Sequence, residues 1–119
     1  KSLDIFLDSC PIITACHGSP AKTIERIIDR NELVDKYLAE IQGKLLICGH
    51  SHRYGTREAN GKNALFCPSI SMPQGNIAKA AMTILEYSGE GWQHRIMYID
   101  YDREKLRCDL LKVVLNESV

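Results

Sequence analysis

The chain has 119 residues, of which 45% are hydrophobic and 25% charged, and its formal net charge is zero. This composition is typical of an ordinary globular domain, and the balanced charge gives no bulk attraction for nucleic acid or for an anionic membrane surface. No apolar run reaches the roughly 18 residues of a membrane-spanning helix. We therefore interpret residues 1–119 as a single domain without a membrane or nucleic-acid partner.

The five cysteines are an odd number, and no two of them have C-x-x-C spacing. Most of them lie within apolar runs, which is typical of reduced, buried thiols in a cytosolic protein. The sequence therefore predicts a cytoplasmic location and free thiols.

The first third of the chain predicts one buried strand between less regular segments. Residues 1–9 alternate weakly and fit either a helix end or a short strand. Pro11 begins an apolar run, rich in β-branched residues, that ends at Cys16 and predicts a strand buried on both faces. Residues 21–30 predict a loop or short helix, since three isoleucines have helical spacing there: Ile24, Ile27 and Ile28.

A helix and a second strand follow. Asn31 is a good helix N-cap and Gly43 a good C-cap, and between them one helical face is apolar. Lys44 to Cys48 then predicts a second buried strand. Strand, helix and strand within about forty residues form a βαβ unit, and the strands of such a unit are parallel.

The rest of the chain predicts two hairpins and a helix. Thr56–Ala59 and Asn63–Cys67 flank Asn60-Gly61, the strongest two-residue hairpin signal, and residues 68–76 form a loop. Ala78–Tyr87 and Trp92–Tyr101 form the second hairpin, in which His94 is expected to be an exposed strand residue. Asp102 caps a final helix, whose apolar face consists of Leu106, Leu110, Leu111, Val114 and Leu115.

Three of the four histidines stand where a predicted strand ends. His17 follows the first strand, and His50 and His52 follow the second. Parallel neighbours end at the same edge of a sheet, so these three side chains should converge, and ligand chemistry in open α/β sheets lies at that edge. Neutral imidazole is the commonest metal ligand. Three histidines are enough for one zinc ion, and the i, i+2 pair can alternatively serve two adjacent ions that clamp a phosphate ester.

The residues around the histidines allow other interpretations. Gly18 and Gly49 would let the backbone approach a ligand closely. Cys16 and Cys48 could join a mixed cysteine–histidine zinc site, although they would then have to point away from the core. A serine nucleophile is disfavoured because no G-x-S-x-G motif is present.

Two of these segments resemble motifs of a known family. The segment C-H-G-S-P at Cys16–Pro20 and the segment I-C-G-H-S-H at Ile47–His52 resemble the last two motifs of the calcineurin-like metallophosphoesterases. The likeness is to small bacterial members that carry H-G-S-P and then G-H-T-H, with Ser51 in place of the usual threonine. Residues Cys67–Ser71 stand where that family has an N-P-G-S-like loop. Their sequence differs from the family motif more than Ser51 does. The resemblance covers most of the chain from Pro11 onwards.

This resemblance implies an α/β fold and a metal-dependent activity. The fold would be part of a four-layer α/β/β/α sandwich, built from a βαβ unit, antiparallel hairpins and a C-terminal helix. His17 and His50 would share one ion of a dinuclear centre, and His52 would hold the neighbouring ion. The metals would be divalent (Mn, Fe, Zn or Ni), and the reaction would be hydrolysis of a phosphomonoester or phosphodiester.

The chain also departs from the family. The motifs D-x-H, G-D-x-x-D and G-N-H, which supply the bridging aspartate, further ligands and a proton-donating histidine, do not occur in it. The resemblance therefore implies that residues 1–119, which start at Lys1, are the C-terminal half of a metallophosphoesterase domain. Such a half would contain no catalytic residue, would be inactive or nearly so alone, and would form homo-oligomers through its exposed face.

Two other classes of function stay open at this point. The chain could be a non-catalytic, protein-binding relative with the same fold. It could also be an unrelated α/β domain with a mononuclear zinc site.

Overall fold

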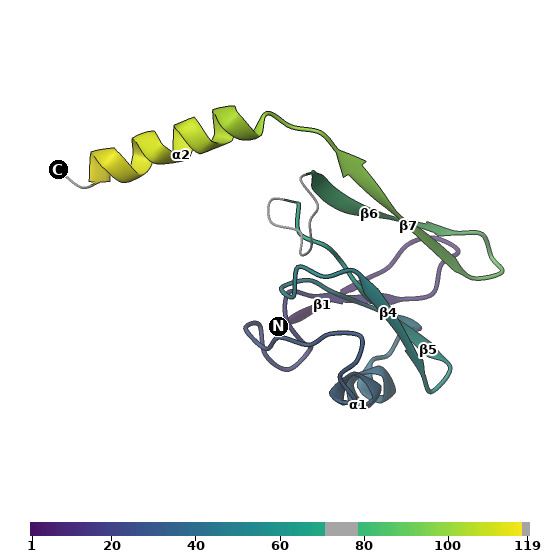
Figure 1. Ribbon diagram of the computed structural model, residues 1–119. Coiled ribbons are helices and arrows are strands. Elements are labelled where there is room, and N and C mark those ends of the chain that lie inside the picture. The colour runs from purple at the N-terminus through teal and green to yellow at the C-terminus, as the bar shows by residue number, and fades with distance from the viewer. Residues whose placement is uncertain (71–78, 118–119) are drawn as a thin grey trace.

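The structure is a computed structural model, and it describes residues 1–70 and 79–117. In this part of the chain most of the regular structure is β-strand, and the two helices come in the middle and at the end (Figure 1). The elements are β1 (Ser2–Ile5), β2 (Ile13–Cys16), α1 (Leu33–Glu40), β3 (Leu45–Cys48), β4 (Gly55–Ala59), β5 (Lys62–Phe66), β6 (Ala80–Tyr87), β7 (Trp92–Ile99) and α2 (Arg103–Glu117).

A five-stranded sheet with the order β1-β2-β3-β5-β4 forms the centre of the molecule. Strands β2, β3 and β5 are parallel to one another, while β1 and β4 are antiparallel edge strands. The βαβ prediction is thus confirmed, because α1 connects the parallel neighbours β2 and β3. The ambiguous first residues form the edge strand β1, held to β2 in part by the Thr14 hydroxyl, which donates to the Asp4 carboxylate at 2.7 Å.

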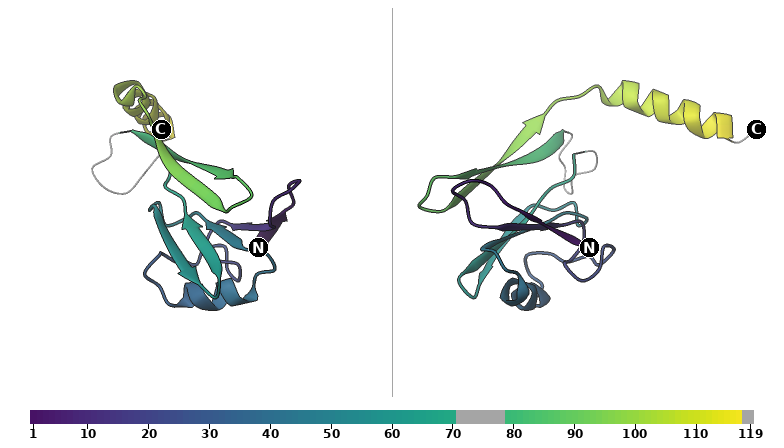
Figure 2. Two further views of the ribbon diagram at one scale, coloured as in Figure 1. Left: turned by 90° about the vertical axis from the view of Figure 1, so that its right-hand side faces the viewer. Right: turned by 180° about the vertical axis from the view of Figure 1, so that it is seen from behind.

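Helix α1 and the β6–β7 hairpin cover opposite faces of this sheet (Figure 2). Residues alternate between the faces along each central strand: Leu46 and Cys48 pack on the α1 side, and Leu45 on the hairpin side. The α1 side also contains buried residues of the helix, of its C-cap and of β5. They are Val34, Tyr37, Leu38, Ile41, Ala64 and Phe66.

The first hairpin matches its prediction closely. Ala59 pairs directly with Lys62, so that Asn60 and Gly61 alone form the turn, and both have left-handed φ values of 56° and 68°. Positive φ at both central positions is what a type I′ turn requires. Lys62 is therefore the first residue of β5.

The structure decides one open prediction before α1 and contradicts another after it. Residues 21–30 form a loop with turns, which is the first of the two predicted alternatives, and Ile27 alone of the three isoleucines is fully buried. Gly43 is not a left-handed helix cap, since α1 ends at Glu40. A Cβ on Gly43 would lie 1.9 Å from the Ile12 carbonyl oxygen, so close backbone approach explains this glycine.

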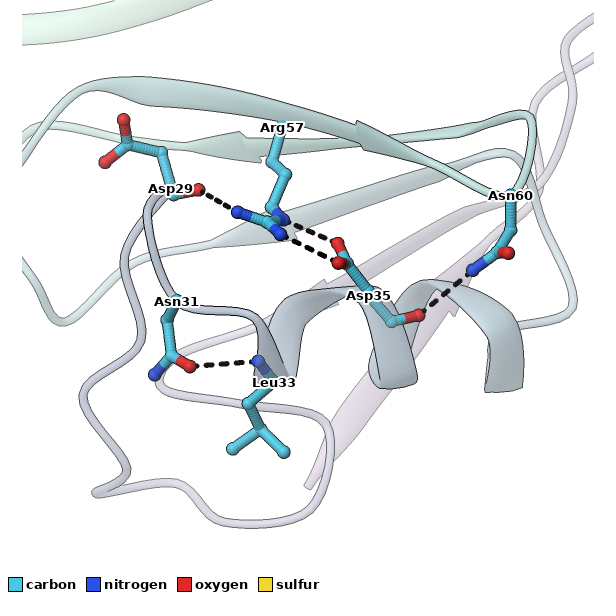
Figure 3. Close-up of polar contacts among 6 residues, drawn as sticks. All are labelled: Asp29, Asn31, Leu33, Asp35, Arg57 and Asn60. Carbon is cyan, nitrogen blue, oxygen red and sulfur yellow. Dashed lines mark hydrogen bonds and ion pairs between the residues drawn. The ribbon is translucent and has the colours of Figure 1, made fainter.

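The start of α1 also differs slightly from its prediction. Glu32 is the N-cap and makes no side-chain cap bond. The Asn31 side chain instead accepts a hydrogen bond from the Leu33 backbone N–H at 2.9 Å (Figure 3). Asn31 thus supplies the capping oxygen one residue before the assigned cap.

A forked ion pair ties α1 to the hairpin strand β4. The Arg57 guanidinium donates to both carboxylate oxygens of Asp35, at 2.5 and 2.7 Å, and to the Asp29 carbonyl at 3.1 Å (Figure 3). The Asn60 side chain donates to the Asp35 carbonyl at 3.3 Å. The adjacent guanidinium lowers the pKa of the Asp35 carboxyl below its usual value.

Helix α2 extends away from the three packed layers (Figures 1 and 2). Asp102 caps it as predicted, because its carboxylate accepts a hydrogen bond from the Lys105 N–H at 2.8 Å. The radius of gyration is 16.9 Å, compared with about 13–14 Å for a compact domain of this length. The large apolar side chains of α2 are all 43–66% exposed: Leu106, Leu110, Leu111, Val113, Val114 and Leu115.

The described residues thus contain a helix layer and two sheet layers of the expected four-layer sandwich. Most of the expected loop 68–76, and Ala78 at the start of the second hairpin, lie outside the described residues. Neither α1 nor α2, the helices of the described residues, is long and apolar enough to cross a membrane.

We expect Gly43→Ala to lower the free energy of unfolding by about 1–3 kcal/mol, because the added Cβ would displace the Ile12 backbone. Urea denaturation followed by circular dichroism measures this loss. The matched control is Gln42→Ala at the exposed neighbouring position, which should leave the transition unchanged. The same urea midpoint for the wild type, Gly43→Ala and Gln42→Ala would contradict the close approach of Gly43 to the Ile12 backbone.

We expect Asp35→Asn to shift the urea midpoint slightly downwards at pH 7, and to shift it progressively less as the pH falls below about 3.9. The folded pKa of Asp35 is lowered, so the ion pair stabilises the fold above the unfolded pKa of about 3.9. That contribution is lost as the pH falls through the folded pKa. Glu104→Gln, which removes an exposed pair with Arg107 at 3.4 Å, is the control without a shift. A shift of the urea midpoint by Asp35→Asn that is the same at every pH would contradict the conclusion that the ionised Asp35 carboxylate stabilises the fold.

Candidate metal centre

Three loops leave the central sheet at one edge. Strands β2, β3 and β5 are parallel, and their last residues are register partners: Cys16 pairs with Cys48, and Cys48 with Phe66. The loops that begin at His17, Gly49 and Cys67 therefore start side by side. This is the edge at which the sequence predicts a ligand site.

His17 and His50 meet at this edge. His50 Nδ1 lies 3.0 Å from His17 Nε2, and the ring centroids are 4.8 Å apart with an interplanar angle of 62°. His17 is exposed and His50 half-buried, so the pair is open to solvent. The predicted convergence of these two residues, 33 positions apart in the chain, is confirmed.

His52 does not join the pair. Within residues 1–70 and 79–117, no three histidine, cysteine, aspartate or glutamate side chains come close enough to hold a metal ion. The structure thus brings together two of the three predicted metal-ligating histidines. It also leaves Cys16 and Cys48 outside any such group, with both thiols on the α1 side of the sheet.

The turn after β3 has an unusual backbone. His50 and His52 both have left-handed φ values, 62° and 59°, a conformation that costs a residue other than glycine about 1–3 kcal/mol. Ser51 between them is buried, its N–H donates to the Gly49 carbonyl at 2.7 Å, and its hydroxyl accepts from the Arg53 N–H. Burial of Ser51 therefore holds the two histidines in their left-handed positions.

The two glycines of the motifs have different roles. A Cβ on Gly18 would lie 2.4–2.8 Å from the carbonyl oxygens of Thr23, Lys22 and Glu25, so this glycine lets the next loop close over it. A Cβ on Gly49 would lie 3.4 Å from the His17 carbonyl, an ordinary contact. Gly18 thus serves packing within the chain, which differs from the predicted approach of backbone to a ligand.

The histidine pair fits one metal ion as two of its ligands. Two nitrogens that each bind an ion at about 2.0–2.1 Å stand roughly 3.0–3.4 Å apart, depending on the coordination geometry. The observed 3.0 Å between His50 Nδ1 and His17 Nε2 falls at the short end of this range, and it is also the length of the hydrogen bond that the two rings make in this structure. Two imidazoles supply half of a tetrahedral ligand set, so further ligands would have to come from solvent, substrate or other groups.

The thiols of Cys16 and Cys48 lie at the ends of the two strands that precede the histidine loops. The Cys16 and Cys48 sulfurs are 3.5 Å apart, and each residue is the last of its strand. The hydrogen bond from Cys48 lowers the pKa of the Cys16 thiol. The same contact, together with burial, raises the pKa of the Cys48 thiol. The sequence predicts both as buried thiols but does not predict their contact, although their equivalent positions before the two motifs were a usable signal.

One further polar contact was not predicted. The Tyr54 hydroxyl lies 2.5 Å from His94 Nδ1 and links the loop after β3 to strand β7. His94 is exposed, as expected. No sequence pattern relates these residues, which are 40 positions apart.

Solved structures with the same fold include phosphoesterases. A metallophosphoesterase from Sphaerobacter thermophilus matches with a TM-score of 0.70 and 15% identity, over 97% of this chain and 55% of that one. A hypothetical protein from Pyrococcus horikoshii matches with a TM-score of 0.75 and 15% identity, over 93% and 45%. Vps29 from Entamoeba histolytica, complexed with zinc, matches with a TM-score of 0.52 and 18% identity, over 84% and 61%.

No family model and no curated protein sequence matches the chain. At these identities the structural matches establish the fold, which is the calcineurin-like metallophosphoesterase fold. The chain spans about half the length of the solved structures it matches.

Proposed function

We propose that this chain carries part of the metal centre of a metal-dependent phosphoesterase. The observation that supports this most directly is the pair of imidazole nitrogens 3.0 Å apart at the carboxyl edge of the parallel strands. The fold adds support, because a metallophosphoesterase is among the solved structures that share it.

In this proposal His17 and His50 hold one divalent ion. A bound ion supplies positive charge that offsets the negative charge of a phosphoryl group during transfer. His52 holds a second ion only when ligands beyond those of this chain are present, since it lies apart from the pair. Manganese, iron, zinc and nickel all suit imidazole and carboxylate ligands.

The chain alone is proposed to lack turnover. Its sequence contains none of the aspartate-bearing motifs that complete a dinuclear centre, and the structure groups no carboxylate with the histidine pair in the described residues. Two imidazoles neutralise none of an ion's charge, so binding should be weak. Phosphomonoesters and phosphodiesters are the proposed substrates of the complete site.

Two competing functions make different predictions. Vps29, a protein named for vacuolar protein sorting, shares the fold and has been solved as a zinc complex. A non-catalytic, protein-binding relative would nevertheless not require a bound metal for its function. A mononuclear zinc domain would bind one ion tightly and would require His52 as well as the other two histidines.

We expect the purified chain to bind about one Mn²⁺ or Zn²⁺ ion weakly, and His50→Ala to reduce this affinity at least tenfold, since it removes one of two protein ligands. Titration calorimetry and elemental analysis measure both quantities. His94→Ala is the matched control, because that histidine lies on β7 and contacts Tyr54 instead. His52→Ala should retain binding of the single ion.

The same experiment separates the alternatives. Absence of metal binding by the wild-type chain would favour the non-catalytic relative. Tight binding that His52→Ala abolishes would favour the mononuclear zinc site. Turnover of p-nitrophenyl phosphate or its bis-ester by the wild-type chain with Mn²⁺, absent in His50→Ala, would contradict the proposed inactivity of the isolated chain.

We also propose that two copies of the chain associate through α2. Its large apolar side chains are 43–66% exposed, and the helix extends away from the packed layers (Figure 1). Exposed apolar surface of this kind favours association. The zero net charge means that two copies do not repel each other.

We expect a dimer or larger oligomer by light scattering at tens of micromolar, and a monomer after the double change Leu110→Glu with Val114→Glu. The charged side chains would make burial of the helix against a second copy unfavourable. Lys105→Glu on the same helix, which leaves the apolar side chains intact, is the control. A monomeric wild-type chain would contradict the proposal.

A further inference from the structure

Cys16 and Cys48 form a close pair of thiols that the proposed metal site does not use. They are register partners on the parallel strands β2 and β3, and their sulfurs are 3.5 Å apart. The other sulfur contacts of Cys16 are weak hydrogen bonds of 3.6 and 3.7 Å to the carbonyl oxygens of Gly18 and Ile47. Both side chains face α1, and Cys48 belongs to the buried cluster on that side.

The positions of the two residues are compatible with a disulfide. Neighbouring strands lie about 4.7–4.9 Å apart, and disulfides join Cα atoms that are about 4.4–6.8 Å apart. The sulfurs need to approach by about 1.5 Å from 3.5 Å to reach the bonded length of about 2.05 Å. Side-chain rotation supplies such a movement without a change in strand register.

The two thiols differ in access. Cys16 is half-buried and directly precedes the exposed His17, whereas Cys48 is 0% exposed. An oxidant in solution therefore reaches the Cys16 thiol first, and the Cys48 thiol lies in contact with that sulfur. Of the other three thiols, Cys67 packs on the hairpin side of the sheet and Cys108 lies on α2, and none of the three, Cys10 included, contacts another sulfur among the described residues.

We propose that Cys16 and Cys48 are a reversible oxidation site that forms an intramolecular disulfide with a hydroperoxide as oxidant. The Cys16 sulfur attacks the peroxide O–O bond, which gives a sulfenic acid and releases one water or alcohol. The Cys48 sulfur then attacks the sulfenic sulfur, the S–O bond breaks, and the oxygen leaves as water with the thiol proton. Two thiols lose two electrons and two protons in total, and the peroxide is reduced. A dithiol reductant reverses the reaction by exchange.

The disulfide would link the two strand ends immediately before the histidine loops. Cys16 precedes His17, and the Gly49 N–H already donates to the Cys16 carbonyl at 3.2 Å. The inference is independent of the proposed phosphoesterase function, because it concerns the thiols alone and requires no metal.

The test maps disulfides in the full chain. Protein reduced and desalted in the presence of a metal chelator is treated with hydrogen peroxide, and its remaining thiols are alkylated under denaturing conditions. We expect each monomer to lose two hydrogens, with one cross-linked peptide containing Cys16 and Cys48 and with Cys10, Cys67 and Cys108 alkylated. Dithiothreitol should restore alkylation of all five thiols.

Two variants sharpen the result. Cys48→Ser should abolish the cross-linked peptide and leave Cys16 as a sulfenic acid that dimedone traps, whereas Cys108→Ser, on the exposed helix α2, should form the cross-link like the wild type. The proposal is overturned if peroxide oxidises Cys10 or Cys108 while Cys16 and Cys48 both remain alkylatable, or if the wild type links separate copies only. Mapping of the wild type alone decides the question if Cys48→Ser does not fold. Because a chelator is present, metal binding by the histidines does not affect the outcome.

Discussion

The parallel register of β2 and β3 is the constraint on which the candidate site depends. It sets Cys16 opposite Cys48, so that the next residues of both strands leave the sheet at the same point. Core packing supports this register, because a slip by one residue would turn Leu46 and Cys48 away from α1 towards the face that the β6–β7 hairpin covers. His17 and His50 meet across 33 positions of sequence because the register sets the ends of the two strands side by side.

The backbone conformation of the turn after β3 also determines where the histidines lie. The left-handed conformations of His50 and His52 carry a free-energy cost, and burial of Ser51 between them supplies the compensating packing. His50 and His52 are both half-buried, and only His50 contacts His17, so the turn brings one of its two imidazoles to the neighbouring strand end.

The sequence was informative where one local signal determined the structure. Asn60-Gly61 specified its turn, and the apolar runs before His17 and before Gly49-His50 specified the strand ends. The prediction from sequence was wrong where contacts between distant segments determine the structure. Gly43 was predicted to be a helix cap, but it is needed because the Ile12 carbonyl leaves no room for a Cβ there. The contact between Tyr54 and His94 depends on pairing of distant segments, so no local pattern in the sequence could reveal it. The contact between Cys16 and Cys48 also depends on such pairing, and only their equivalent positions before the two motifs hinted at it.

The two chemistries proposed for this edge share one structural cause and remain separable. Cys16 directly precedes His17, and Cys48 lies two residues before His50. The thiols face α1, whereas the histidines belong to the loops that follow the strands. A change that disturbs strand register would remove both the thiol pair and the histidine pair. A change that removes only a thiol or only an imidazole should affect one of the two pairs, since the thiol pair and the histidine pair consist of different side chains. Loss of both properties together therefore indicates a change in the fold, and loss of one indicates a change in the site.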